Sequence, residues 1–389
     1  MHPAVPFSTT RLDSLLDDFG IDVLIVTSRH NIQYLLGGYY HFQFDFMEAV
    51  GISRFLPVFV YVKGDLGKAV YIANRNERDS VANRTSAGHW MPQVVFGSST
   101  SVEAMTLALK HVKAEATSAL RVGIEGSFLP VDAADVLRKE LRNCQLVEAM
   151  RPLEKLRAIK TAAELDILRE ASERVVASMM DTVGQIRPGQ SKRDIIGHLK
   201  QAELSRGMIF EYALVTLGTS LNRAPSDQRL EPGDVISLDS GGNYGGYIGD
   251  LCRMAIHGAP DGELVDLLDE IDVIQQAARK PIRSGLIGRD IYAAAEEALA
   301  QSTHGKQMHF VAHGMGIVSH EAPRLTSTGP IPYPADDANE PLEAGMIISI
   351  ETTLPHARGF IKLEDTIAVT ADGYEAFGDG ARGWNRVLG

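Results

Sequence analysis

The chain has 389 residues, 44% hydrophobic and 23% charged, a globular composition that is long for one hydrophobic core, so two domains are expected. Its net charge of -12 and the lack of a basic stripe disfavour binding to nucleic acid or to anionic membrane surfaces. Cys144 and Cys252 form no metal-finger or CxxC spacing, and no secretory leader or membrane-length apolar run is seen, so a cytoplasmic location is expected.

The first 150 residues alternate between strand-like and helical patterns. Strand-like apolar runs are IDVLIVT (21–27), FLPVFVYV (55–62), AVYIA (69–73) and RVGIEG (121–126). Helical patterns occur at Arg11 to Phe19, at Ser101 to Val112 and around Ala133 to Arg142. This alternation predicts an α/β domain.

An aromatic segment, YYHFQFDFMEAVGISRF, occupies residues 39–55. Phe42, Phe44 and Phe46 alternate with other residues, which predicts that the three rings share one side of an extended segment. Two interpretations are open for it: a loop that packs on a core or a domain, and a lid over a substrate pocket.

The second domain is expected to occupy residues 156–389. A polar connector, RPLEKLRAIK, leads into Thr161-Ala-Ala-Glu164, a capping box that predicts the start of a helix. Further helices are predicted at 191–207, 262–280 and 287–301, with strands between and after them.

An internal repeat lies in this domain. LEPGDVISLD, ending at Asp239, recurs as LEAGMIISIE, ending at Glu351, and each copy is followed by a strand with another acid, Asp250 or Glu364. Similar turns entering two strands would give such a likeness by chance, but here the acids correspond as well as the apolar positions. The repeat predicts two related half-domains, each offering one pair of acids.

Acids within apolar strands are costly to bury unless they are paired or bind metal. Alternation along Tyr247 to Ile256 puts Asp250 on the same face as apolar residues, so it is expected inside. Four such acids would repel one another, whereas two divalent cations would balance their charge. His313, beside glycines in HFVAHGMG, adds a neutral nitrogen ligand. This donor set suits Mn²⁺, with Zn²⁺, Co²⁺ or Fe²⁺ as competitors.

The order and spacing of these residues resemble those of the M24 metallopeptidase superfamily, which includes creatinase, aminopeptidase P and prolidase. Five positions match that family's metal ligands: Asp239, Asp250, His313, Glu351 and Glu364. LDSGGNYGGYIGDLCR, HGMGIVSHEAP and FIKLEDTIAVT are similar to its three catalytic stretches, and the likeness covers nearly the whole chain. It implies an α+β architecture: a creatinase-type α/β domain at 1–155, and at 156–389 a pita-bread catalytic domain. In that domain two pseudo-symmetric half-domains share a curved antiparallel sheet covered by helices.

The resemblance also implies a dinuclear metal-dependent hydrolase, an Xaa-Pro aminopeptidase or dipeptidase that cleaves the bond N-terminal to proline. Two ions would share a hydroxide that attacks the scissile carbonyl. Glu351 would bind metal and act as general base, and His320 would contact the substrate or the tetrahedral intermediate. A homodimer is implied, in which the aromatic segment walls the pocket of the partner.

Two neighbours of these residues are expected to be supporting residues. Glu321 and Asp365 each follow a motif residue, and alternation along the strand turns Asp365 away from Glu364. For His320 itself a second interpretation stays open, since a histidine in a Gly-rich loop also serves as a partner of backbone groups.

Asn222 and Lys362 are among the positions that depart from the family pattern. Asn222, in GTSLNRAPSDQRLEPGD, aligns with a histidine of the peptidases, and an amide cannot carry a proton near pH 7. Lys362 lies where aminopeptidase P-like members have Arg, so a point charge replaces a two-pronged contact. Both are expected on the substrate side.

These departures leave open a hydrolase or lyase of this fold that acts on a small amidino, cyclic amidine or sulfonium compound. A binding protein without catalysis is a third alternative, which the five retained ligands disfavour.

Overall fold

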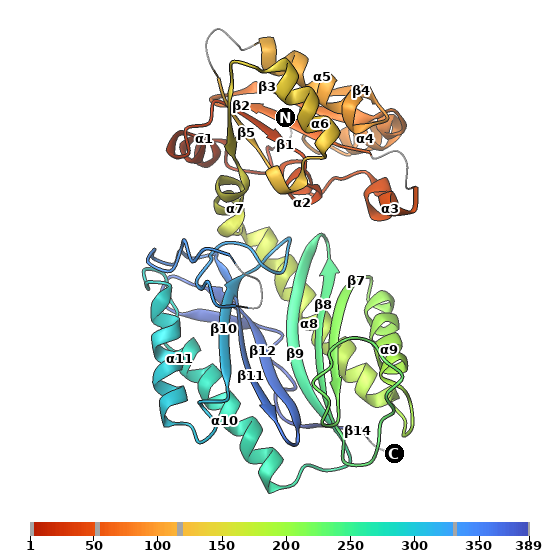
Figure 1. Ribbon diagram of the computed structural model, residues 1–389, viewed down its shortest axis with the longest axis vertical. Coiled ribbons are helices and arrows are strands. Elements are labelled where there is room, and N and C mark those ends of the chain that lie inside the picture. Colours follow the sequence, from red (N-terminus) through yellow and green to blue (C-terminus); the bar gives the residue numbers. More distant parts are fainter. Residues whose placement is uncertain (1–3, 51–54, 115–119, 330–332, 388–389) are drawn as a thin grey trace. The chain divides into compact units, whose positions relative to one another are not determined.

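The computed structural model describes four stretches of the chain: residues 4–50, 55–114, 120–329 and 333–387. It divides into two compact units, Met1–Arg157 and Ala158–Gly389 (Figure 1). Over the part of the chain that is described, no helix combines the length and the apolar character needed to cross a membrane.

The first unit is an α/β unit built on one sheet. Its strands are β1 (Val23–Val26), β2 (Val58–Val62), β3 (Asp65–Asn74), β4 (Gln93–Ser98), β5 (Arg121–Ile124) and β6 (Gln145–Glu148). Its helices are α1 (Thr9–Asp18), α2 (Arg29–Leu35), α3 (Met47–Val50), α4 (Arg78–Ser86), α5 (Ser101–Ala114), α6 (Val131–Glu140) and α7 (Met150–Ala158), with 3₁₀ turns η1 (Phe42–Phe46), η2 (Arg75–Glu77) and η3 (Gly126–Phe128). Among the described residues the strand order is β4-β3-β2-β1-β5-β6, which confirms the predicted α/β class.

Burial explains why the apolar runs became the centre of this sheet. All four residues of β1 are buried, and β1 pairs antiparallel with β2 and parallel with β5. Ala104, Ala108 and Val112 of α5 lie at helical spacing and belong to the same core cluster as strand residues of β1 and β2. The apolar strands and the apolar side of α5 therefore form the core of this unit.

Two segments of this unit differ from expectation. Residues 150–158, within the expected connector, form α7, because Leu153 and Leu156 are buried on one side of an amphipathic turn. The aromatic segment is not extended at 42–46 but forms η1. Its tighter winding separates the rings: Phe42 contacts Phe46 with centroids 5.5 Å apart, whereas Phe44 contacts Phe55 at 5.2 Å.

The second unit is built on a larger sheet. Its strands are β7 (Ile209–Leu217), β8 (Val235–Tyr244), β9 (Tyr247–His257), β10 (His309–Gly314), β11 (Ile347–His356), β12 (Gly359–Val369), β13 (Tyr374–Phe377) and β14 (Asn385–Val387). Its helices are α8 (Ala162–Gln185), α9 (Lys192–Ser205), α10 (Gly262–Arg279) and α11 (Arg289–Gln301). Within the described residues the main path is β10-β11-β12-β9-β8-β7, with antiparallel neighbours, while β13 pairs with β12 and β14 with β9.

The internal repeat forms two hairpins, β8–β9 and β11–β12, which lie side by side in the sheet (Figure 1). Asp239 lies opposite Cys252 in the first hairpin, and Glu351 lies opposite Glu364 in the second. The hairpins meet where Glu364 lies opposite Cys252. Three of the four acids therefore form a row across four strands, and Asp250 lies two residues from Cys252 on the same face.

Helices cover the other face of these strands. The residues next to the acids point away from them: Leu238 and Leu251 belong to a core cluster with α8 and α9, and Ile350 and Leu363 to a cluster with α10. The predicted capping box of Thr161 with Glu164 opens α8, and Ser191 with Asp194 forms a second capping box at the start of α9. Because the neighbouring residues pack against the helices, the acids lie on the opposite face of the sheet.

Glu203 of α9 is a fully buried acid behind this sheet. Its Oε1 accepts a hydrogen bond of 2.7 Å from the Ser240 hydroxyl, and its Oε2 has no hydrogen-bond partner among the described residues. Burial raises the pKa of Glu203 from its ordinary 4.5 to about 7. The stability contributed by its neutral form is fully present below pH 4.5 and is lost as the pH rises through about 7.

We therefore expect Glu203→Gln, which cannot ionise, to gain stability relative to the native chain as the pH rises from about 4.5 to 8, by on the order of 3 kcal/mol. Urea unfolding of both proteins across this pH range measures the difference. Glu173→Gln, at an exposed position of α8, is the matched control and should follow the native curve. A constant difference between Glu203→Gln and the native chain would contradict a buried carboxyl that ionises near neutral pH.

Candidate metal centre

A cavity of about 260 Å³ opens over the row of acids in the second unit. Its lining includes seven of the eight residues singled out in the sequence: Asp239, Asp250, His313, His320, Glu351, Lys362 and Glu364. Strand alternation brings most of them together, because His313 lies two residues beyond Val311, the partner of Glu351, and Lys362 lies two residues before Glu364. The four strands of the repeat, together with β10, thus contribute to one cavity.

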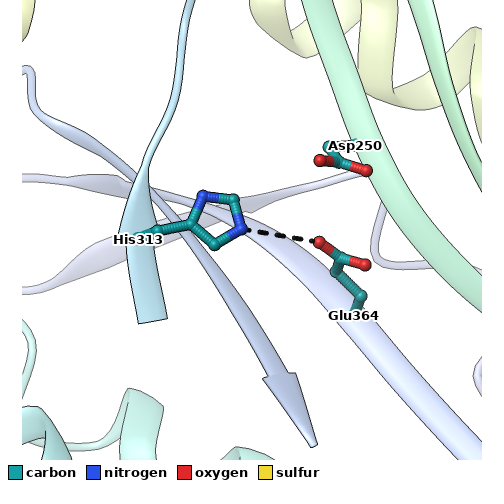
Figure 2. A group of neighbouring side chains, drawn as sticks. All are labelled: Asp250, His313 and Glu364. Carbon is teal, nitrogen blue, oxygen red and sulfur yellow. Dashed lines mark ion pairs between the residues drawn. The ribbon is translucent and has the colours of Figure 1, made fainter. Parts of the chain in front are cut away.

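Three of these side chains form a group that can hold a cation. Asp250, His313 and Glu364 come from β9, β10 and β12 and point toward one another, with one donor atom of each within 4.8 Å of the others (Figure 2). His313 Nε2 lies 3.8 Å from Glu364 Oε1. Its Nδ1 lies 3.2 Å from the Gly314 carbonyl, which assigns the proton to Nδ1 and leaves the Nε2 lone pair facing the acids. This nitrogen and oxygen donor set fits a divalent first-row metal ion.

Lys362, expected on the substrate side, lies among the carboxylates. Its Nζ is 2.7 Å from Asp239 Oδ2, 2.5 Å from Glu351 Oε2 and 2.8 Å from Glu364 Oε2. The side chain is buried, with 2% of the residue exposed. An ammonium has three N–H donors, and three carboxylate oxygens surround this one.

Two further lining residues carry chemistry that the sequence did not indicate. Tyr212 of β7 donates a hydrogen bond of 2.5 Å from its hydroxyl to Asp250 Oδ2. Arg223 pairs through Nη2 with Asp239 Oδ2. Within the described residues Asn222 is not part of the lining: its carbonyl accepts a hydrogen bond from Lys192, and its side chain accepts one from the Ala224 N–H. Asn222 as a substrate contact therefore stays a prediction without support from this geometry.

Burial and neighbouring charges shift the pKa of three of the acids, Asp239, Asp250 and Glu364. Burial raises the pKa of Asp250 well above its ordinary value, and the charges of Glu364 and Asp239 raise it further. Burial also raises the pKa of Asp239 to about 6. Burial opposes ionisation of Glu364 as well, but Lys362 and His313 hold its pKa below the ordinary value. The cluster thus needs positive charge to stay ionised, as the sequence predicted.

The Lys362 ammonium is itself stabilised by this cluster. Burial alone would lower the pKa of Lys362, but the negative charges of Asp239, Glu351 and Glu364 raise it well above the ordinary value. Lys362 therefore stays charged at neutral pH.

His320 lies against His313, with the two rings stacked at a centroid distance of 3.8 Å. Burial, with the neighbouring His313, lowers the pKa of His320 to about 3, so the ring is neutral at pH 7. Its Nδ1 is buried and makes no hydrogen bond to any described residue. A neutral imidazole with an unused nitrogen at the cavity can bind a polar substrate group.

The two supporting residues are held behind the site. As the sequence predicted, Asp365 points away from Glu364, and it lies 3.1 Å from Arg253 Nη1 and 2.8 Å from Arg279 Nη2, with Arg382 as a third partner. Although burial opposes it, these guanidinium groups lower the pKa of Asp365 to about 2. Glu321 pairs with Lys160 at 2.9 Å, and both side chains are buried. These pairs fix β12 and the loop that carries His320.

Two family models match this chain. The model described as "Metallopeptidase family M24" matches residues 166–371, and that described as "Creatinase/Prolidase N-terminal domain" matches residues 9–159.

Curated relatives cover this chain to different extents. "Uncharacterized peptidase YqhT" of Bacillus subtilis is 24% identical over 93% of this chain and 95% of its own length. "Probable dipeptidase PepE" of Mycobacterium tuberculosis is 29% identical over 63% of this chain and 60% of its own length.

Solved structures share the fold along the whole chain. The "Xaa-Pro dipeptidase from Bacillus anthracis" superposes with a TM-score of 0.80 at 23% identity, covering 97% of this chain and 98% of its own. The X-Pro aminopeptidase from Thermotoga maritima gives 0.77 at 18% identity, covering 98% and 99%. These likenesses confirm the predicted α+β architecture.

The arginine cluster behind β12 gives a test of the support for the site. Asp365→Asn removes the buried carboxylate that contacts both Arg253 and Arg279, so we expect the free energy of unfolding to fall by on the order of 3–5 kcal/mol. Chemical denaturation of both proteins measures it. Asp266→Asn, on the exposed side of α10, is the control and should lose little. Equal stability of Asp365→Asn and the native chain would contradict this role.

Proposed function

Because this chain belongs to metallopeptidase family M24, we propose that it is a metal-dependent Xaa-Pro peptidase that hydrolyses the peptide bond on the amino side of proline. The observation that carries the proposal is the convergence of Asp250, His313 and Glu364, together with His320, on one buried cavity. The names of the fold relatives, an Xaa-Pro dipeptidase and an X-Pro aminopeptidase, support the same reaction.

The cavity volume bears on peptide length. At about 260 Å³ it lies just below the range of roughly 300–1,000 Å³ that is usual for ligand pockets. A dipeptide is the substrate that this volume favours, with a longer Xaa-Pro peptide as the other form of the proposal.

We propose Mn²⁺ as the native ion, with Zn²⁺, Co²⁺ and Fe²⁺ as competitors, since carboxylates outnumber imidazole among the donors. Asp250, His313 and Glu364 would hold it, with Asp239 and Glu351 as the further ligands predicted from the sequence. A bound divalent ion supplies Lewis acidity that activates water and polarises a carbonyl. Two divalent ions, as predicted from the sequence, would balance the charge of four carboxylates. Lys362 and Arg223, however, already contribute two positive charges to this cavity.

Glu351 is the residue we propose as general base. It is the most exposed of the four acids, at 8% against 2–4% for the others, so water in the cavity can reach it. Lys362 Nζ lies 2.5 Å from its Oε2 and holds this carboxylate in the wall of the cavity, where it can accept a proton from water. Because Asn222 cannot titrate and lies outside the lining, Glu351 would also return this proton to the departing proline nitrogen.

His320 would bind the carbonyl oxygen as negative charge develops on it. His320 lines the cavity, its ring is held in place by the stack on His313, and its Nδ1 makes no hydrogen bond to a described residue. A donor positioned in this way stabilises the transition state more than the ground state.

We also propose that the enzyme is a cytoplasmic homodimer. Both cysteines are free, Cys144 partly exposed and Cys252 buried, which fits a reducing compartment. The homodimer follows from the family resemblance.

The reaction is tested with the Mn²⁺-loaded protein against Xaa-Pro dipeptides and longer Xaa-Pro peptides. We expect hydrolysis of the bond before proline, loss of activity on chelation and recovery on adding Mn²⁺. The same peptides with Ala in place of Pro are the control and should be poor substrates. Absence of turnover for every Xaa-Pro peptide by a metal-loaded protein would reject the proposal, and turnover of an amidino or sulfonium compound instead would replace it.

The role of His320 predicts a separation of catalysis from metal binding. His320→Asn should lower kcat by about 10²–10³-fold, as loss of one oxyanion donor does, while metal content stays unchanged. Steady-state kinetics and metal analysis measure both, with His89→Asn, an exposed histidine of the first unit, as the control. A variant that lost its metal together with its activity would instead assign His320 a structural role at the metal centre.

A further inference from the structure

The cavity is lined by positive side chains as well as by the four carboxylates, so its net charge is smaller than that of the carboxylates alone. Among the described lining residues, the four carboxylates face two cationic side chains, Lys362 and Arg223. Two negative charges remain. One divalent cation cancels them, whereas two such ions would leave a buried excess of positive charge.

The Lys362 ammonium lies among carboxylate oxygens, in surroundings that would suit a metal ion. Its Nζ contacts oxygens from three strands: Asp239 of β8, Glu351 of β11 and Glu364 of β12, at 2.5–2.8 Å. All three donors of the ammonium are used, and the side chain is buried. To displace it, an ion would have to leave this ammonium without partners in the interior.

Glu364 divides its two oxygens between Lys362 and the metal group. Its Oε2 contacts Lys362, while its Oε1 accepts a hydrogen bond of 2.9 Å from Ser349 and faces His313. Asp250 lies outside the contacts of Lys362 within the described residues, and its Oδ2 accepts the Tyr212 hydroxyl. The group Asp250, His313 and Glu364 therefore stays open to one ion while Lys362 is in place.

Asp239 contacts two positive side chains of the cavity lining. Its Oδ2 contacts both Lys362 and Arg223, and it is not a member of the three-residue metal group. An ion at Asp239 would therefore compete with two cations that the chain itself supplies.

We propose that the ammonium of Lys362 takes the position of the second metal ion, so that each chain holds one divalent ion, at Asp250, His313 and Glu364. The proposal rests on the metal-dependent function proposed above and specifies it: the protein supplies one of the two cations from its own side chain. Glu351 then contacts a fixed charge of the chain instead of an exchangeable ion.

The test is the metal content of the full-length protein, loaded with Mn²⁺, freed of excess ion and measured by elemental analysis. We expect one Mn per chain in the native protein and two in Lys362→Met, which has a similar length and no charge. Lys192→Met is the matched control, because Lys192 is also buried but bonds to the Asn222 carbonyl outside the cavity, and it should keep one Mn. His313→Ala should lose the single ion.

Electron paramagnetic resonance of the native Mn²⁺ protein gives a second measurement that depends on no variant. It should show the hyperfine pattern of an isolated ion and not that of a spin-coupled pair. Two Mn per native chain, a coupled pair, or a folded Lys362→Met that keeps one Mn would each overturn the proposal. A native protein that binds two Mn²⁺ ions per chain and cleaves Xaa-Pro peptides would overturn the single-ion proposal and leave the proposed function standing. A native protein that binds no metal would reject both the single-ion proposal and the proposed function.

Discussion

Four carboxylates are buried on one face of the large sheet, and the chemistry of the second unit depends on the positive charge that neutralises them. Glu351 and Glu364 lie directly opposite each other on neighbouring strands, an arrangement that like charges normally destabilise. Burial raises the pKa of Asp239 and Asp250, so without cations part of the cluster would take up protons. The ionised cluster therefore exists only together with its cations, of which Lys362 and Arg223 belong to the chain itself.

The fold places these acids by simple strand geometry. Two hairpins of similar sequence bring three of their acids to one row and Asp250 to the same face two residues away. Alternation sends the residues beside these acids into helix-covered cores on the other face. Asp365 shows the same rule, since one step along β12 from Glu364 it meets arginines instead of acids. On one face β12 contributes Glu364 to the cavity, and on the other face it contributes Asp365 to a cluster of arginines.

Much of this could be predicted from the sequence because it follows from local pattern. Acids embedded in apolar strands, repeated at equivalent positions, indicate burial and therefore cations, and capping boxes such as Thr161 with Glu164 mark helix starts. The features that could not be predicted depend on the conformation of irregular backbone or on how far side chains extend between strands. Arg223 and not Asn222 lines the cavity because the loop conformation decides which neighbour turns inward, and Tyr212 lies in a strand with no distinctive spacing. Lys362 was expected on the substrate side, and its contacts with three acids could not be predicted because they depend on how three strands approach one another.

Anomalous diffraction at the manganese edge from crystals grown with Mn²⁺ near pH 7 tests most directly whether cations hold this cluster together. The account predicts a strong peak in contact with Asp250, His313 and Glu364, with Lys362 Nζ beside Asp239. Crystals without a peak at these residues, or with the acid side chains pointing apart, would contradict it.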